Sequence, residues 1–210
     1  MEDIYQSFEE VFKNEEEGID YSVIVEELIS PASILALHGG GIEPGTEELA
    51  KEVHRLGEGL FVFSGIKRSG NRALHVTSTK YDHPEAVKLV KESFLTVAIH
   101  GAEGYEPMTF VGGLCEIGID AIAISLQNAG FDVSTDPPEK INGRHPQNIV
   151  NRNRRGKGVQ VEITEAQRKL FFKGLHSRYL REYKTEDFFE YAKALRKGID
   201  TAKNIILPRD

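Results

Sequence analysis

The sequence predicts a single α/β domain built on a mixed, mostly parallel sheet with helices on both faces. Short apolar runs of strand length alternate along the chain with stretches of helical pattern, the order in which strand–helix–strand units are built. The length of 210 residues is typical of one domain with a substantial core. Hydrophobic residues make up 40% and charged residues 28% of the chain, which is the composition of a folded globular protein.

The first half of the chain opens with a polar, acidic extension, residues 1–20, in which we expect a short helix and a loop. The apolar run Ser33–Leu37 leads into three glycines, a pattern that predicts a buried strand followed by a tight turn. A helix is expected over Thr46–Leu56, with Thr46 as its N-cap. The next predicted elements are strands over Gly59–Ser64 and Ala73–Thr77 and a helix over His83–Ser93.

The second half repeats the alternation of strands and helices. Predicted strands cover Leu95–Ile99, Thr109–Gly112, Phe131–Ser134 and Val159–Ile163, and predicted helices cover Glu116–Ala129 and Phe188–Asn204. Ligands of such sheets bind at the carboxyl ends of the strands. His38 and His100 each follow a predicted strand directly, so this edge of the sheet is where we expect the functional site.

His38, Glu43 and His100 form a candidate metal site. In the stretch HGGGIE, an imidazole and a carboxylate five residues apart flank three glycines, which let the backbone turn so that both side chains face one centre. His100 supplies a third ligand from a separate strand end. Two histidines and one glutamate with an open fourth position form a known catalytic zinc set, so Zn²⁺ is the predicted cofactor, although the same donors also bind other divalent ions.

Two different functions of the glycine-rich turn fit the sequence less well. Such a turn also binds phosphate, but the Glu43 carboxylate would repel phosphate and the loop has no Walker A or G-x-G-x-x-G pattern. HGGG also occurs in esterase oxyanion loops, but the required G-x-S-x-G elbow is missing from the sequence.

The other histidines near these motifs and the cysteine are given structural roles. His75 is interpreted as a core or supporting histidine, His83 as a helix-start residue and Cys115 as a small buried residue.

Glu162 is the candidate general base. Strand alternation over residues 158–164 places Val159, Val161 and Ile163 on one face, and Gln160 and Glu162 on the other. A carboxylate beside a metal site can take a proton from the attacking water. The pattern alone is equally compatible with a surface carboxylate in an edge strand.

A basic segment, residues 140–157, stands out in an otherwise acidic chain of net charge −7. Its basic residues are Lys140, Arg144, Arg152, Arg154, Arg155 and Lys157, with no acidic residue among them. The overall charge argues against nucleic acid as a partner, whereas the segment predicts a local anion site in which arginine recognises carboxylates and stabilises an oxyanion. A solvated loop is the simpler alternative.

The N-terminal sequence, the lengths of the apolar runs and the cysteine content bear on the cellular location of the protein. The start of the chain is acidic and lacks the apolar core of a signal peptide, and no apolar run has the length of a membrane span. The single cysteine rules out an internal disulfide. We therefore expect a cytoplasmic protein without a signal peptide or a membrane partner, which can also meet its substrate after release on cell lysis.

The combination LHGGGIEPGT, LHVTSTKYDHP, AIHGAEG, VGGL and NIVNRNRRGKGVQVEIT, spread over residues 22–164, resembles the zinc-dependent poly-γ-glutamate hydrolases of phages and bacteria. The resemblance implies a fold like that of the zinc carboxypeptidases, although the spacing here is H-x₄-E instead of H-x-x-E. It implies metal ligands at His38, Glu43 and His100 and a catalytic glutamate at Glu162. It also implies a pocket lined by arginine for the free α-carboxylates, with Asn151 and Arg152 matching the family's N-R and Arg154 matching more loosely.

The function implied is hydrolysis of the γ-glutamyl amide bonds of poly-γ-glutamate, with Glu162 as base and Arg152 as the oxyanion partner. Two alternatives stay open. One is a zinc amidase, carboxypeptidase or deacylase acting on another peptide or N-acyl amino acid. The other is a phage accessory protein that binds metal without catalysis. A monomer is the expected oligomeric state.

Overall fold

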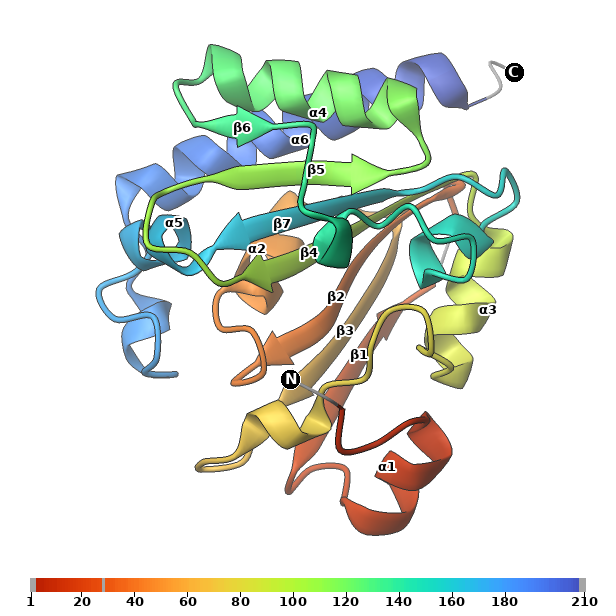
Figure 1. The fold of residues 1–210 in the computed structure, drawn as a ribbon, viewed down its shortest axis with the longest axis vertical. Coiled ribbons are helices and arrows are strands. Elements are labelled where there is room, and N and C mark those ends of the chain that lie inside the picture. Colours follow the sequence, from red (N-terminus) through yellow and green to blue (C-terminus); the bar gives the residue numbers. More distant parts are fainter. Residues whose placement is uncertain (1–2, 28, 208–210) are drawn as a thin grey trace.

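The computed structural model describes residues 3–27 and 29–207 and contains a seven-stranded mixed sheet (Figure 1). The strands are β1 (Tyr21–Glu26), β2 (Ala32–Gly40), β3 (Gly59–Gly65), β4 (Leu95–Ala102), β5 (Thr109–Gly113), β6 (Val133–Ser134) and β7 (Val159–Thr164), in the spatial order β1-β3-β2-β4-β7-β5-β6. The pairs β3–β2, β2–β4, β4–β7 and β5–β6 are parallel, and β1–β3 and β5–β7 are antiparallel. The predicted mixed, mostly parallel sheet is confirmed.

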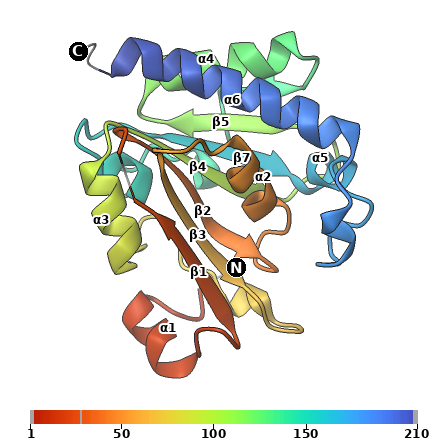
Figure 2. The ribbon, with the colours of Figure 1, turned by 180° about the vertical axis from the view of Figure 1, so that it is seen from behind.

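Helices cover both faces of the sheet, as predicted. They are α1 (Phe8–Asn14), α2 (Thr46–Val53), α3 (Pro84–Glu92), α4 (Glu116–Asn128), α5 (Glu165–Leu170) and α6 (Glu186–Ile206). Figures 1 and 2 show α4 and α6 running along one side of the sheet, with α1 and α3 on the other. Leu49 of α2, Ile122 of α4 and Leu195 of α6 belong to one buried cluster, whereas Phe8 of α1 and Leu89 of α3 belong to a second. Each such buried side chain contributes roughly 1.5–3 kcal/mol.

The N-terminal extension is part of this packing. Ser7 caps α1 by accepting a hydrogen bond from the Glu10 amide, which satisfies one of the free amides of the first turn. Phe8 and Val11 then place their side chains, 1% and 0% exposed, against the sheet. None of the helices that the structure describes has the length and apolar character required to cross a bilayer.

Two local predictions are corrected, and one strand was not predicted. Ala73–Thr77 is not a strand: Asn71–Leu74 forms a 3₁₀ helix, because both edges of the neighbouring β3 are already paired, with β1 and β2. Strand β1 was not predicted. Thr46 is not the N-cap of α2, since Gly45 takes that place with φ 97° and the Thr46 hydroxyl donates to the Glu43 carbonyl at 2.9 Å.

The topology brings three strand ends together. Strands β2, β4 and β7 are adjacent and parallel, so their carboxyl ends meet at one edge of the sheet. In the β4–β7 register, His100 lies directly opposite Glu162. Strand β7 is flanked on both sides by β4 and β5, which excludes the edge-strand interpretation of Glu162.

Candidate metal centre

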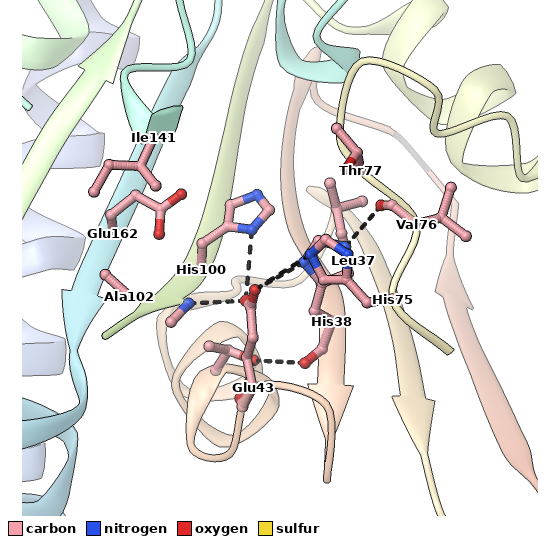
Figure 3. A network of polar contacts seen from close by, with 12 residues as sticks. Leu37, His38, Glu43, His75, Val76, Thr77, His100, Ala102, Ile141 and Glu162 are labelled. Carbon is pink, nitrogen blue, oxygen red and sulfur yellow. Dashed lines mark hydrogen bonds and ion pairs between the residues drawn. The ribbon is translucent and has the colours of Figure 1, made fainter. Parts of the chain in front are cut away.

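His38, Glu43 and His100 lie side by side at the carboxyl ends of β2 and β4 (Figure 3). His38 Nδ1 is 3.1 Å from Glu43 Oε1, and His100 Nδ1 is 3.5 Å from Glu43 Oε2. The Gly101 amide donates to Glu43 Oε2 at 2.8 Å, which fixes the carboxylate between the two imidazoles. The structure therefore brings together the three residues that the sequence nominated.

The glycine turn explains how Glu43 returns to His38. The Glu43 amide donates to the His38 carbonyl at 2.8 Å, closing the loop over five residues. Gly40 has a φ of 65°, and a Cβ at this position would lie 2.3 Å from the Gly65 carbonyl oxygen. Any other residue would both strain the backbone and separate β2 from β3, so this loop geometry requires glycine.

His75 joins the cluster, which sequence reasoning did not predict. Its ring stacks on His38 with 4.0 Å between ring centroids, and its Nε2 lies 3.9 Å from Glu43 Oε1. Ligand-type atoms of His38, Glu43 and His75 all lie within 4.8 Å of one another. The Asp3 carboxylate accepts hydrogen bonds from His75 Nδ1 at 2.6 Å and from the Thr77 amide at 2.8 Å. The acidic N-terminal segment thus supplies a carboxylate behind this histidine.

The hydrogen bonds of His38 and His75 match those of metal-ligating histidines. His38 Nε2 donates to the Val76 carbonyl at 2.9 Å, and Nδ1 is the nitrogen that faces the Glu43 carboxylate. In the same way, His75 Nδ1 donates to Asp3, and Nε2 lies on the Glu43 side. A hydrogen bond on the second ring nitrogen is the usual support of a metal-ligating histidine.

Two further observations agree with this interpretation. Among the residues that the structure describes, the buried His100 Nε2 has no hydrogen-bond partner, which is costly for a polar atom and is a feature of functional sites. The available donors are imidazole nitrogens and a carboxylate, the mixture that zinc and other divalent transition metals prefer. The residues present therefore fit the predicted metal, with His75 as an additional nitrogen donor at the same centre.

The electrostatics separate the two glutamates of the site. Burial alone would raise the pKa of Glu43, but His38 and His100 hold it well below its usual value. Burial and the nearby Glu43 charge raise the pKa of Glu162 well above its usual value. His38 and burial together lower the pKa of His75 to about 4. Of the two carboxyl groups, Glu43 is therefore the one that favours the charged form of a ligand, and Glu162 is the one that binds a proton more readily.

Glu162 faces a cavity of about 660 Å³ that also exposes His38, Glu43 and His100. The Gln160 side-chain amide donates to Glu162 Oε1 at 2.8 Å, and Asn148 donates to Gln160 Oε1 at 2.8 Å. Val159, Val161 and Ile163 lie in the core on the opposite face of β7, which confirms the predicted alternation. The carboxyl group of Glu162 is thereby held in a fixed orientation toward the cavity.

The arginines predicted for the pocket lie elsewhere. Arg152 donates to the Tyr81 carbonyl, and the Arg154 guanidinium lies over the Phe94 ring, 5.3 Å from its centroid. Asn151 donates to the carbonyls of Gly143 and His145 at 2.7 and 3.0 Å. The cavity is lined instead by two other basic residues, Arg72 and Lys140, together with Gly143, His145 and Asn148. Asn151 thus supports the cavity wall from behind.

The structure also bears on the roles that the sequence suggested for His83 and Cys115. His83 stands at the N-cap position of α3, as predicted. Its ring also packs edge-on against Phe8, 4.9 Å between centroids, and burial lowers its pKa to about 4. Cys115 is buried, 1% exposed, and is part of the apolar core.

Comparison with known proteins gives a consistent result. A family model described as poly-gamma-glutamate hydrolase matches residues 5–194. The UPF0714 protein YndL of Bacillus subtilis (strain 168) is 36% identical over 198 residues, which cover 92% of this chain and 77% of YndL. The solved structure of a bacteriophage poly-gamma-glutamate hydrolase superposes with a TM-score of 0.92 at 34% identity and covers 97% of this chain and 100% of that one. A zinc-free apo structure of YndL superposes with a TM-score of 0.87 at 34% identity, covering 95% and 98% of the two chains.

Proposed function

Because the chain belongs to the poly-gamma-glutamate hydrolase family, we propose that it hydrolyses the γ-glutamyl amide bonds of poly-γ-glutamate and that His38, Glu43 and His100 hold the zinc ion it requires. The observation that carries the proposal is the arrangement of these three residues opposite Glu162 around one cavity. The zinc-free form solved for YndL supports the choice of metal. His75 is included as a further nitrogen donor.

Glu162 is the proposed general base. When bound, zinc lowers the pKa of a coordinated water and polarises the carbonyl group under attack. Glu162 accepts the proton of the attacking water and then delivers it to the leaving amine, while Gln160 keeps the carboxyl group oriented. Burial raises the pKa of Glu162 well above its usual value, and a carboxyl group that binds a proton more readily suits a residue that both takes and returns one.

Substrate recognition is assigned to Arg72 and Lys140. Poly-γ-glutamate carries one free α-carboxylate per residue, and a chain of net charge −7 repels such a polyanion unless basic groups border the cleft. Both side chains are exposed at the cavity, where their charges attract the polymer. In the present arrangement Arg152 is bound to the Tyr81 carbonyl, so its predicted role toward the oxyanion requires the side chain to leave that bond.

The test is metal content and polymer cleavage measured together. The purified protein is assayed for bound zinc and incubated with poly-γ-glutamate, with and without a chelator. We expect about one zinc per chain and shortening of the polymer that the chelator abolishes and added zinc restores. Zinc without polymer cleavage would contradict the substrate and direct the search to other peptide or N-acyl amides. No metal, in both this protein and its His38→Ala variant, would contradict the metal site itself.

The cytoplasmic location, release on lysis and the monomeric state stay predictions.

Product analysis in the same assay distinguishes internal from terminal cleavage of the polymer, because an internal cut releases γ-glutamyl oligomers whereas a terminal cut releases monomers. A protein that binds zinc but cleaves no amide in any class tested would match the accessory role that the sequence leaves open.

A further inference from the structure

Arg168 is a buried arginine directly beneath the candidate metal centre. It lies in α5, which follows β7 immediately, and is 5% exposed. Its guanidinium donates to three backbone carbonyls: to Ile163 at 3.0 Å from Nε, to Pro44 at 2.6 Å and to Ala102 at 3.1 Å from the terminal nitrogens. One planar group therefore connects three separate segments of the chain.

Each of these segments carries a residue of the proposed site. Pro44 follows Glu43, Ala102 comes two residues after His100, and Ile163 follows Glu162. The distances among the metal ligands and the base thus depend on where three carbonyl groups lie, and Arg168 binds all three. A guanidinium suits this task because its five donors diverge in a rigid plane.

The pairing of Arg168 differs from that of the other buried arginines in the described part of the chain. Arg181 donates to Glu48 at 2.6 Å and Arg196 donates to Glu58 at 2.7 Å. Within residues 3–27 and 29–207, Arg168 has no carboxylate at ion-pair distance; Glu43, Glu165 and Glu162 act on it only through their charge. A buried cation without a paired anion carries a desolvation cost, and here the hydrogen bonds to three carbonyl groups are what offsets it.

Gly101 leaves room for the guanidinium. A Cβ added at this position would lie 2.6 Å from Arg168 Cζ, a separation that real contacts do not reach. The Gly101 amide also donates to Glu43 Oε2. The strand that carries His100 therefore rests directly against the guanidinium, and the residue in contact with it also holds the Glu43 carboxylate.

We propose that Arg168 is a positioning residue, whose guanidinium fixes the separations among Glu43, His100 and Glu162 by holding the three chain segments that carry them. The inference rests on the proposed function for its catalytic consequence, but its effect on metal binding is independent of the substrate.

The experiment compares Arg168→Met and Arg168→Lys in the full chain with Arg196→Met as a matched control, since Arg196 is equally buried, 4% exposed, but lies on α6 away from the site. Zinc affinity is measured by competition with a chelator, kcat and KM are measured with poly-γ-glutamate, and stability is measured by thermal unfolding. For Arg168→Met we expect zinc affinity and kcat each to fall about tenfold or more, the range typical of groups that support metal ligands, with KM within about twofold. Arg168→Lys, which keeps the charge and part of the donor set, recovers part of both losses.

The control is expected to unfold at a lower temperature with kcat and zinc affinity unchanged. Zinc affinity and kcat within about twofold of the parent protein in both Arg168 variants would overturn the proposal, because the residue would then contribute to stability alone. If Arg168→Met does not fold, Arg168→Lys decides by the same criteria. If the parent protein cleaves no polymer, the proposed function fails, and the zinc titration still decides whether Arg168 positions the ligands.

Discussion

The metal cluster and the basic segment 140–157 border one cavity but differ in what fixes their side chains. His38 and His100 stand at the ends of adjacent parallel strands, so the sheet itself determines their separation. The basic segment contains no strand, and several of its polar side chains bind backbone groups: Asn151 binds Gly143, and Arg152 binds Tyr81. We infer that the cluster performs the chemistry, whereas much of the basic segment shapes the wall around it.

The strongest test of this division is Glu162→Gln. The substitution keeps the size and the hydrogen-bonding capacity of the side chain but removes the base, and general acid–base catalysis contributes roughly 10²–10⁴-fold. We expect kcat on poly-γ-glutamate to fall by that factor while the bound zinc is retained. Metal content measured on the same preparation is the control. Full activity with zinc in place would show that the base is another group.

The second test is Asp3→Asn, which probes the support behind His75. Asparagine offers the His75 Nδ1 proton a weaker, uncharged acceptor, and the loss of such supporting carboxylates typically costs about 10–100-fold in metal affinity. Chelator competition measures the change, and His75→Ala is expected to lower the affinity at least as much. Asp20→Asn is the matched N-terminal control, because the Asp20 carboxylate accepts a hydrogen bond from the Glu16 amide instead of from a histidine. Equal zinc affinity in all variants would remove His75 from the metal centre.

The same difference explains what the sequence could predict. His38, Glu43 and His100 were identifiable because strand ends of a parallel sheet converge and glycines mark the turn between them. Asp3 and His75 are 72 residues apart and meet only through the packing of the N-terminal segment, which no local pattern encodes. Arg168 binds carbonyls rather than a charged partner, so charge patterning gave no signal for it. Arg152 and Arg154 point away from the cavity in this structure, which the sequence could not show, because charge indicates that a side chain is cationic but not which way a loop directs it.

The third test is Asn151→Ala, which asks whether the segment is structural. The Asn151 side chain accepts from the Gly158 amide at 2.9 Å and donates to Gly143 and His145. Removing it leaves buried backbone groups without partners, at a cost of about 1–3 kcal/mol each. We expect the free energy of unfolding, measured in urea, to fall by at least about 1 kcal/mol, with zinc content unchanged. Unchanged stability together with a raised KM would instead return Asn151 to the substrate site predicted from the sequence.

The smallest expected effect compares the basic residues directly. Arg72 and Lys140 are exposed at the cavity, and Arg72 lies 3.6 Å from Glu103 without deep burial, so each contact with a substrate carboxylate is worth roughly 0.2–1 kcal/mol. Arg72→Ala and Lys140→Ala are therefore expected to raise KM by a factor of roughly 1.4 to 5 each, an effect that added salt reduces because exposed charges are screened. Arg154→Ala, at the Phe94 ring, is expected to leave KM unchanged.

Arg152→Ala decides between the two accounts of the segment. If its guanidinium stays on the Tyr81 carbonyl, the substitution lowers stability and leaves both kinetic constants near those of the parent protein. If Arg152 turns to the cavity when substrate binds, kcat falls while the loss of stability is small, because an interaction made only in the transition state lowers kcat without a matching change in KM. The second outcome would make Arg152 of the basic segment part of the catalytic machinery. The metal cluster and the basic segment would then differ in what positions their side chains, since the fold places the metal ligands and substrate binding places Arg152.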